Sequence, residues 1–179
     1  MIELRSERFL LRPWRKSDLP ALVRHANNKK IADQLRDGFP YPYTEADGRS
    51  FLKMAMRSKP INVFAIEIDG EAVGSIGFFA QGDVHRLNAE IGYWLAEIHW
   101  GKGIMSEVIQ VFADYVFANY SLVRLYAQVL GNNVASHRVL EKAGFVREAV
   151  FKKAIIKNGR LYDEVVYALL RPDYYYFEK

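Results

Sequence analysis

NAEIGYWLAEIHWGKGIMS, residues 88–106, contains the strongest structural signal in the chain. An apolar run at residues 88–95 has strand character, a turn spaced by Gly101 and Gly103 follows it, and an amphipathic helix begins at once. Such a helix start leaves backbone N–H groups without partners at the positive end of the helix dipole. The pattern therefore predicts an anion site at the turn, or else a plain strand-to-helix connection whose glycines serve tight packing.

Composition narrows the class of protein. The chain has 179 residues, of which 50% are hydrophobic and 26% charged, and this is typical of one globular domain spanning residues 1–179. Cysteine is absent, which excludes disulfides, thiolate metal sites and a cysteine nucleophile. The net charge of +4 suits a polyanionic ligand such as a phosphorylated cofactor, but it is too small and too dispersed to predict specific nucleic-acid binding.

The chain shows no sign of a membrane segment. The basic first sixteen residues contain no apolar run of signal-peptide length, and nowhere do about 18 apolar residues stand together. We therefore expect a cytoplasmic protein with no membrane partner.

The order of strand and helix patterns predicts an α/β sandwich with a mixed sheet. Asp69-Gly70 and Asn158-Gly159 predict tight hairpins, and the helix between residues 88–95 and 121–129 predicts a parallel crossover. Strands are expected at residues 7–14, 61–68, 71–79, 88–95, 121–129, 145–156 and 160–170. Helices are expected from residue 18 with Ser17 as N-cap, at residues 29–36, from Thr44 with Asp47 completing its cap, after residue 103, and at residues 134–142. Helical periodicity places Met56 and Ala135 on inner faces.

Two familiar phosphate-binding motifs are missing. No GxxxxGK string followed by Ser or Thr occurs, which excludes a P-loop. A dinucleotide fingerprint starting at Gly101 would need glycine at position 106, where Ser106 stands. Nicotinamide cofactors are thus disfavoured.

A longer set of motifs resembles a known family. HWGKGIMSEVI, preceded by EIGYWL and followed by NNVASHRVLEKAGF, resembles the Gcn5-related N-acetyltransferase (GNAT) superfamily, most of all its RimJ/RimL branch, which acetylates protein N-termini. This resemblance implies a three-layer sandwich whose mixed, mostly antiparallel sheet has about seven strands, with a central parallel pair splayed for the cofactor. It also implies acetyl-coenzyme A (acetyl-CoA) as cosubstrate.

The resemblance also assigns the cofactor-binding positions. The pyrophosphate is expected on the N–H groups of residues 101–106, and a backbone N–H near Leu95 is expected to polarise the thioester carbonyl. Trp100 is common at its position in the branch, whereas Met105 replaces a small residue of the family pattern. The assigned positions are Trp94, Leu95, Gly101, Lys102, Gly103, Ile104, Met105, Ser106, Asn133 and Ser136.

Acetyl transfer to an amine needs a base and a proton donor. Glu90, on the central strand, is expected to be partly buried with a raised pKa and to act as the base; the alternative is a solvated or salt-bridged strand residue. The resemblance makes Ser136 the proton donor to the leaving thiolate and Asn133 a cofactor amide partner; the alternative is ordinary helix capping. Weaker candidates for the base are Asp163, Glu164, His85 and His99. No cluster has metal-ligand spacing, so we predict no metal.

Three functional hypotheses remain open. The first is an N-acetyltransferase acting on a primary amine, either a protein or peptide N-terminus or a small amine such as a polyamine, aminoglycoside or amino acid. The second is a non-catalytic acyl-coenzyme A-binding module. The third is RNA binding through the basic N-terminal segment and Lys152, Lys153 and Lys157. Residues 39–43 and the hairpin around Asn158 are expected to shape the acceptor site, and residues 174–177 to pack or form a homodimer contact.

Overall fold

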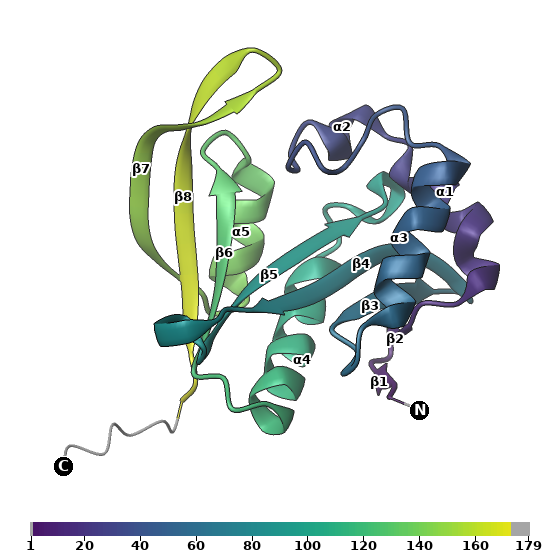
Figure 1. Ribbon diagram of the computed structural model, residues 1–179, viewed down its shortest axis with the longest axis horizontal. Helices are drawn as coiled ribbons and strands as arrows, with labels where there is room; N and C mark the ends of the chain where they lie inside the picture. The colour runs from purple at the N-terminus through teal and green to yellow at the C-terminus, as the bar shows by residue number, and fades with distance from the viewer. Residues whose placement is uncertain (1, 173–179) are drawn as a thin grey trace.

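The computed structural model describes residues 2–172, so the tail expected to pack or dimerise lies outside the described residues. Within them, eight strands form one sheet in the order β1-β2-β3-β4-β5-β6-β8-β7 (Figure 1). Neighbouring strands are antiparallel, except that β5 and β6 are parallel. The predicted mixed, mostly antiparallel sheet with a central parallel pair is confirmed.

Most element bounds follow the sequence patterns, but the helix predicted at residues 29–36 ends at Ala32, after which Gln34 and Leu35 form only turns. The strands are β1 (Leu4–Arg5), β2 (Leu10–Pro13), β3 (Val63–Ile68), β4 (Glu71–Ala80), β5 (Asn88–Leu95), β6 (Arg124–Leu130), β7 (Val146–Lys157) and β8 (Arg160–Leu170). The α-helices are α1 (Leu19–Ala26), α2 (Lys29–Ala32), α3 (Glu45–Arg57), α4 (Ile104–Asn119) and α5 (Val134–Lys142). Three 3-10 turns are η1 (Lys16–Asp18), η2 (Asp83–His85) and η3 (Glu97–His99). The eighth strand is β1, which lies before the first predicted range and was not predicted; within residues 7–14 only β2 forms a strand.

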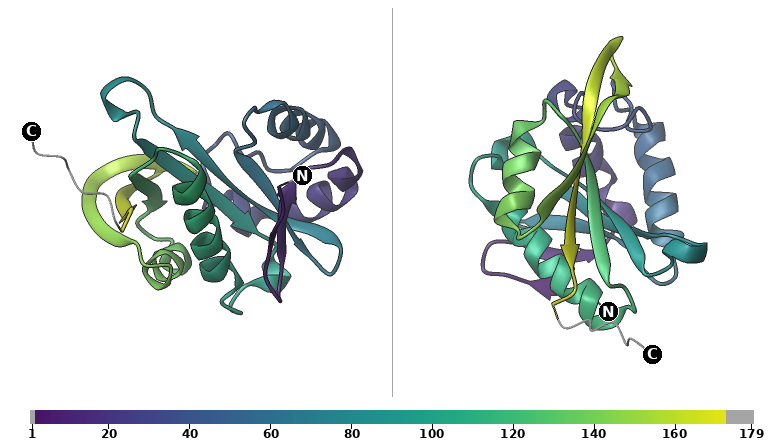
Figure 2. Two further views of the ribbon diagram at one scale, coloured as in Figure 1. Left: turned by 90° about the horizontal axis from the view of Figure 1, so that it is seen from below. Right: turned by 90° about the vertical axis from the view of Figure 1, so that its left-hand side faces the viewer.

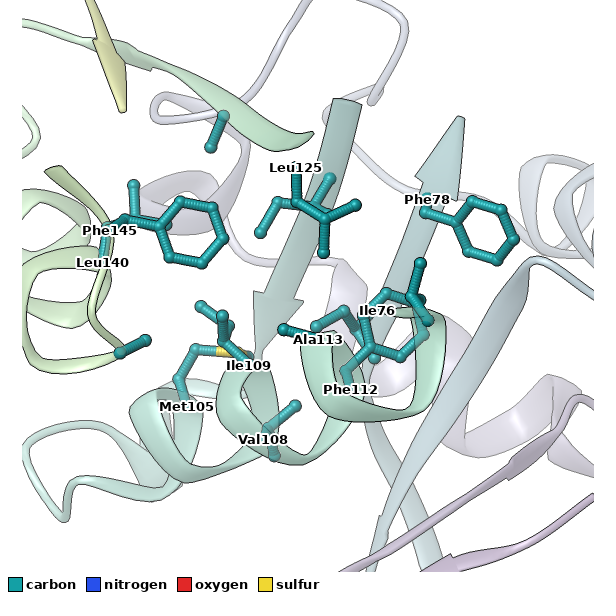
Figure 3. Close-up of a cluster of buried hydrophobic side chains, with 14 of the residues drawn as sticks. Ile76, Phe78, Met105, Val108, Ile109, Phe112, Ala113, Leu125, Leu140 and Phe145 are labelled. Atoms are coloured by element: carbon teal, nitrogen blue, oxygen red, sulfur yellow. The ribbon is translucent and has the colours of Figure 1, made fainter. Parts of the chain in front are cut away.

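Helices cover both faces of the sheet (Figure 2). Alternate side chains of β5 point to opposite faces of the sheet. Ile91 and Leu95 lie in the core beneath α4 and α5, whereas Trp94 lies in a second core beneath α1 and α3. Figure 3 shows Met105 in the first core beside Ile109. Fully burying a side chain of this size contributes roughly 1.5–3 kcal/mol. The central strand is therefore held from both faces.

The start of α1 differs from the prediction. Ser17 lies inside η1 and caps no α-helix, because Asp18 is the residue that organises this turn. Its carboxylate accepts the backbone N–H of Arg15 at 2.7 Å and both Nη atoms of Arg12 at 2.8 Å. Arg12 is 2% exposed and also pairs with Glu67 on β3. The buried guanidinium thus joins η1 to the sheet, as a buried cation requires charged partners.

Two inner-face predictions were wrong. Met56, in the last turn of α3, is 43% exposed, and Ala135, in the first turn of α5, is also exposed. The buried face of α3 follows Gly48, Leu52 and Ala55, and Met56 lies to one side of it, whereas α5 fully buries only Leu140.

Thr44→Ala is expected to lower the free energy of unfolding by about 1 kcal/mol at neutral pH. Thr44 and Asp47 form the predicted capping box: the Thr44 backbone N–H donates to Asp47 at 2.8 Å, and the Asp47 N–H donates to the Thr44 hydroxyl at 3.3 Å. The hydroxyl hydrogen bond lowers the pKa of Asp47 below its ordinary 3.8. This stabilisation is present above that value and is lost as pH falls through the folded-state pKa.

Urea unfolding at neutral and acidic pH measures this effect. The difference between wild type and Thr44→Ala should shrink in acid. Ser50→Ala, on the exposed face of the same helix, serves as the control and should cost nothing. Equal stability of Thr44→Ala and wild type at neutral pH would contradict the role of the cap.

Candidate active site

The parallel strands β5 and β6 separate after three residue pairs. Their recorded pairing runs from Asn88 opposite Arg124 to Glu90 opposite Tyr126, and the register continues no further. The carboxyl-terminal halves of the two strands diverge visibly in Figure 1. An opening therefore interrupts the sheet at its centre, as the resemblance implied.

Backbone groups of β5 point into this opening. Ala96 donates its N–H to Val73 at 2.8 Å, so the backbone groups of Ala96 face β4. Backbone groups of successive residues in an antiparallel strand point to alternate sides. Those of Tyr93 and Leu95 therefore point away from β4. The Leu95 carbonyl accepts the indole N–H of Trp100 at 2.7 Å. Within residues 2–172, the Leu95 N–H and both backbone groups of Tyr93 consequently lack a strand partner on the side of the opening. Buried backbone groups of this kind require hydrogen-bond partners.

The start of α4 presents a second set of free donors. Gly103 is its N-cap, with φ of +76°, and no side chain caps the helix. The N–H groups of Ile104, Met105 and Ser106 therefore have no intrahelical partner. A Cβ built on Gly101 or Gly103 would meet nothing within 4 Å, so the turn is open above its backbone. This geometry suits a phosphate group.

Side chains of the first α4 turn do not obstruct that surface. Met105 is 7% exposed and packs in the core among Ile109, Leu140 and Phe145 (Figure 3), so its size does not hinder approach to the backbone. The Ser106 side chain is likewise buried. The residues of this turn can therefore offer an anion their backbone N–H groups.

Arg8 supports the turn, and the sequence analysis did not single it out. Its guanidinium donates to the Lys102 carbonyl at 2.7 Å and contacts Glu107 of α4 at 3.3 Å. Arg8 precedes Lys102 by 94 residues, and no local pattern reveals such a contact. Arg8 fixes the turn from outside and adds positive charge beside it.

Glu90 lies at the base of the opening, on the face covered by α1 and α3. Its side chain is 19% exposed and pairs with Arg36, which also donates to Gln128 of β6 at 2.6 Å. Arg36 comes from the segment between α2 and α3. Burial first, and then the charge of Glu90, raises the pKa of Tyr126 opposite. Glu90 is partly buried, as expected of the base. It is also salt-bridged, as expected if it is an ordinary strand residue.

Ser136 and Asn133 meet the opening from the other face. Asn133 caps α5 by accepting the Ser136 N–H at 3.1 Å, as the capping alternative proposed. This uses the Asn133 side-chain oxygen and leaves its amide N–H groups for another partner. The Ser136 hydroxyl lies 2.5 Å from the hydroxyl of Tyr93 on β5. Asn133 and Ser136 therefore cap α5 and also lie at the opening.

The weaker candidates for a base have other surroundings. Asp163 accepts the Lys153 N–H and pairs with Lys152, and these contacts lower its pKa, which makes it a poorer base. His85 lies in η2, before β5 begins, at the end opposite the opening. Burial, followed by the charge of Lys102, lowers the pKa of His99. Glu164 pairs in register with Leu130.

Neither a metal centre nor a membrane span emerges from residues 2–172. Among them, His, Asp and Glu side chains form no group of three or more that could hold a metal ion. The helices of the same region are too short or too polar to cross a bilayer.

The opening, the donors at the start of α4 and the two-sided helical cover define a class of protein. Residues 8–146 match a family model described as the acetyltransferase (GNAT) domain. The chain belongs to this GNAT family.

Curated relatives carry acetyltransferase names. The uncharacterized N-acetyltransferase YoaA of Bacillus subtilis is 42% identical over 57% of this chain and 57% of its own length. The ribosomal-protein-serine acetyltransferase of Escherichia coli is 33% identical over 59% of each chain. The match thus spans a little over half the length of these relatives.

Solved structures share the fold over nearly the whole chain. The ribosomal L7/L12 alpha-N-protein acetyltransferase RimL, solved in complex with coenzyme A, is 25% identical with a TM-score of 0.85. The alignment covers 94% of this chain and 98% of RimL. The GNAT fold, with its likeness to the RimJ/RimL branch, is confirmed.

Proposed function

We propose that the protein transfers an acetyl group from acetyl-CoA to a primary amine, by direct attack while both substrates are bound. One observation carries the proposal: the free N–H groups at the start of α4 and those at the β5–β6 opening belong to a single strand–turn–helix unit. Such a unit offers hydrogen-bond donors both to a diphosphate and to the amide-bearing arm that joins it to a thioester. The family relationship supports the same donor substrate.

The residues present fit this donor. Residues 101–106 would hold the diphosphate by backbone N–H groups, with Lys102 and Arg8 adding positive charge. The Trp94 side chain packs on Phe39 in the core beneath α1 and α3, and its backbone groups face β4, so Trp94 would support the donor only by holding β5 in place. The free amide N–H groups of Asn133 can reach a carbonyl of the arm.

Glu90 is the proposed base. It lies where β5 and β6 part, and a proton leaving the attacking amine would pass to its carboxylate directly or through water. Arg36 fixes the orientation of that carboxylate. Three residues further along β5, about 10 Å away, Tyr93 and Ser136 meet on the opposite face. Base and proton donor therefore flank the opening from its two sides.

The proton balance closes with these residues. A carbon–nitrogen bond forms to the acetyl carbon, and the carbon–sulfur bond breaks with its electron pair on sulfur. Glu90 removes one proton from the nitrogen, Ser136 gives one to the sulfur, and the proton on Glu90 returns to Ser136 through solvent. The Leu95 N–H donates to the thioester oxygen, and a well-placed donor of this kind contributes about 3–4 kcal/mol.

The proposed acceptor site is a hollow of about 370 Å³ beside the opening. The hollow is lined by α2, residues 39–41 and the tip of the β7–β8 hairpin, which include the two segments that the sequence suggested for the acceptor. Two contacts join these parts: Asn158 donates to Asp33 at 2.9 Å, and Lys157 to Asp37 at 2.8 Å. A hollow carrying charges of both signs suits the start of a peptide, and relatives named for ribosomal proteins favour a protein N-terminus.

Tyr41→Ala is expected to raise KM for the acceptor about tenfold while leaving the affinity for acetyl-CoA unchanged. Tyr41 lines the hollow and is half exposed, so its ring is available to a substrate. Steady-state kinetics with varied acceptor, and calorimetry with acetyl-CoA, measure the two effects. Met54→Ala, equally exposed on α3, is the control. An unchanged KM for the acceptor would place the acceptor elsewhere.

A screen of amines tests the function itself. Short peptides, polyamines, aminoglycosides and amino acids are incubated with acetyl-CoA, and free thiol is measured. Release that requires a peptide N-terminus supports the proposal, whereas release only with small amines would redirect it to that class. Acetyl-CoA binding without thiol release on any amine favours a non-catalytic binding module. The salt bridge between Arg36 and Glu90 would suit such a module, because it engages the carboxylate of the proposed base.

RNA binding is less well supported. Lys152 pairs with Asp163, and the buried Lys157 pairs with Asp37, so two of the three lysines in question are already neutralised. A flat dependence of RNA affinity on salt would dismiss this alternative.

A further inference from the structure

Two hydroxyl groups meet across the β5–β6 opening. Tyr93 extends from β5 and Ser136 from the first turn of α5, and their oxygen atoms lie 2.5 Å apart. The tyrosine ring packs against the core beneath α4 and α5, which leaves its hydroxyl little freedom. The serine is fixed from the other side, because its N–H is bound by Asn133 at 3.1 Å. Both ends of this contact are thus held by structure on either side of the opening.

The direction of this hydrogen bond decides what Ser136 can do. A serine hydroxyl has one proton to donate and two lone pairs to accept with. If Ser136 donates to Tyr93, its proton is used; if it accepts, its proton stays available. Burial raises the pKa of Tyr93 and outweighs the hydrogen bond with Ser136, which acts in the opposite direction, so the phenol keeps its own proton. A protonated phenol can act as the donor.

We propose that Tyr93 is a positioning residue: it donates its hydroxyl proton to the oxygen of Ser136 and so directs the serine proton toward the leaving sulfur. This inference rests on the proposed function. The sulfur keeps the electron pair of the broken carbon–sulfur bond and takes the Ser136 proton, while Tyr93 retains its own proton and stabilises the charge that develops on the serine oxygen. Tyr93 itself exchanges no atom with substrate.

The chain contains a matched control. Tyr167 on β8 also anchors α5 by a single hydroxyl contact, donating to Glu141 at 3.0 Å. Tyr167→Phe removes the same hydroxyl group from another contact between a strand and α5, but this contact is at Glu141 and not at Ser136. A purely structural role of Tyr93 predicts similar losses from both substitutions.

A double-mutant cycle tests the inference on the full chain. Tyr93→Phe should lower kcat about tenfold and Ser136→Ala about 100-fold, while KM for acetyl-CoA stays within about twofold. Because Tyr93 acts through Ser136, the double variant should be no slower than Ser136→Ala. Tyr167→Phe should leave kcat unchanged. Losses that multiply in the double variant, or an equal loss in Tyr167→Phe, would overturn the inference.

A second measurement separates this inference from the acetyltransferase proposal. The thiol pKa of bound coenzyme A, followed by the ultraviolet absorbance of its thiolate, needs neither acceptor nor turnover. A higher thiol pKa in Tyr93→Phe than in wild type supports the inference, even if every amine fails and the proposed function falls. Equal values in the two proteins refute it. If coenzyme A does not bind at all, both proposals fail together.

Discussion

We expect Glu90→Gln to lower kcat by about 10²- to 10⁴-fold and to leave the affinity for acetyl-CoA within about twofold of wild type. The amide has nearly the shape of the carboxylate and can still accept a hydrogen bond from Arg36, but it cannot take a proton from the amine. In the proposed site, binding of the donor relies on backbone groups further along β5 and at the start of α4. The substitution therefore separates chemistry from binding.

Thiol-release kinetics and calorimetry measure the two effects. The matched control is Glu148→Gln, which alters another salt-bridged strand glutamate, paired with Arg124 on β6. This control should retain full activity, since its side chain lies outside the proposed site. If Glu90→Gln retained the kcat of wild type, Glu90 would not be the base, and water or another residue would have that role.

Gly103→Val is expected to raise the Kd for acetyl-CoA about 100-fold. Gly103 has a φ of +76°, which a β-branched residue cannot adopt without strain. The peptide groups beside it must rotate to relieve that strain, and this moves N–H groups of the diphosphate site. Hydrogen bonds to a charged group are worth about 1.5–3 kcal/mol each, so losing two accounts for the effect.

Gly70→Val provides the control for strain. Gly70 has a φ of +80° in the β3–β4 hairpin, and a Cβ there also meets nothing within 4 Å. Both variants should lose similar stability in thermal unfolding, but only Gly103→Val should lose affinity in calorimetry. Equal affinities of the two variants would show that the turn before α4 does not hold the donor.

Local sequence patterns predicted most of the fold. The bounds of β5 and α5 agree with the predicted ranges, because strand alternation, helical periodicity and glycines such as Gly144 act over a few residues. The first strand was predicted too long, since β2 covers only Leu10–Pro13. The Ser17 cap was wrong because Asp18, which binds the buried Arg12, organises the turn before α1. Met56 was wrong because periodicity does not fix how wide the buried face of a helix is, and in α3 that face includes Ala55 but not Met56.

The candidate site was predicted less completely. Turn chemistry and the family resemblance pointed to Gly103, Glu90 and Ser136, whose main signals lie in short motifs. The partners of those residues are distant in sequence: Arg36 lies 54 residues from Glu90, and Tyr93 lies 43 residues from Ser136. Only the folded chain brings such pairs together, so a single sequence contains no signal for them.

Residue-resolved amide hydrogen exchange, with and without acetyl-CoA, tests most directly whether the donor occupies the β5–β6 opening and the start of α4. We predict that exchange at Leu95, Ile104 and Met105 slows by about tenfold or more on binding, while exchange at Gly70 does not change. Saturating acetyl-CoA that leaves all three amides exchanging at their original rates would contradict the account.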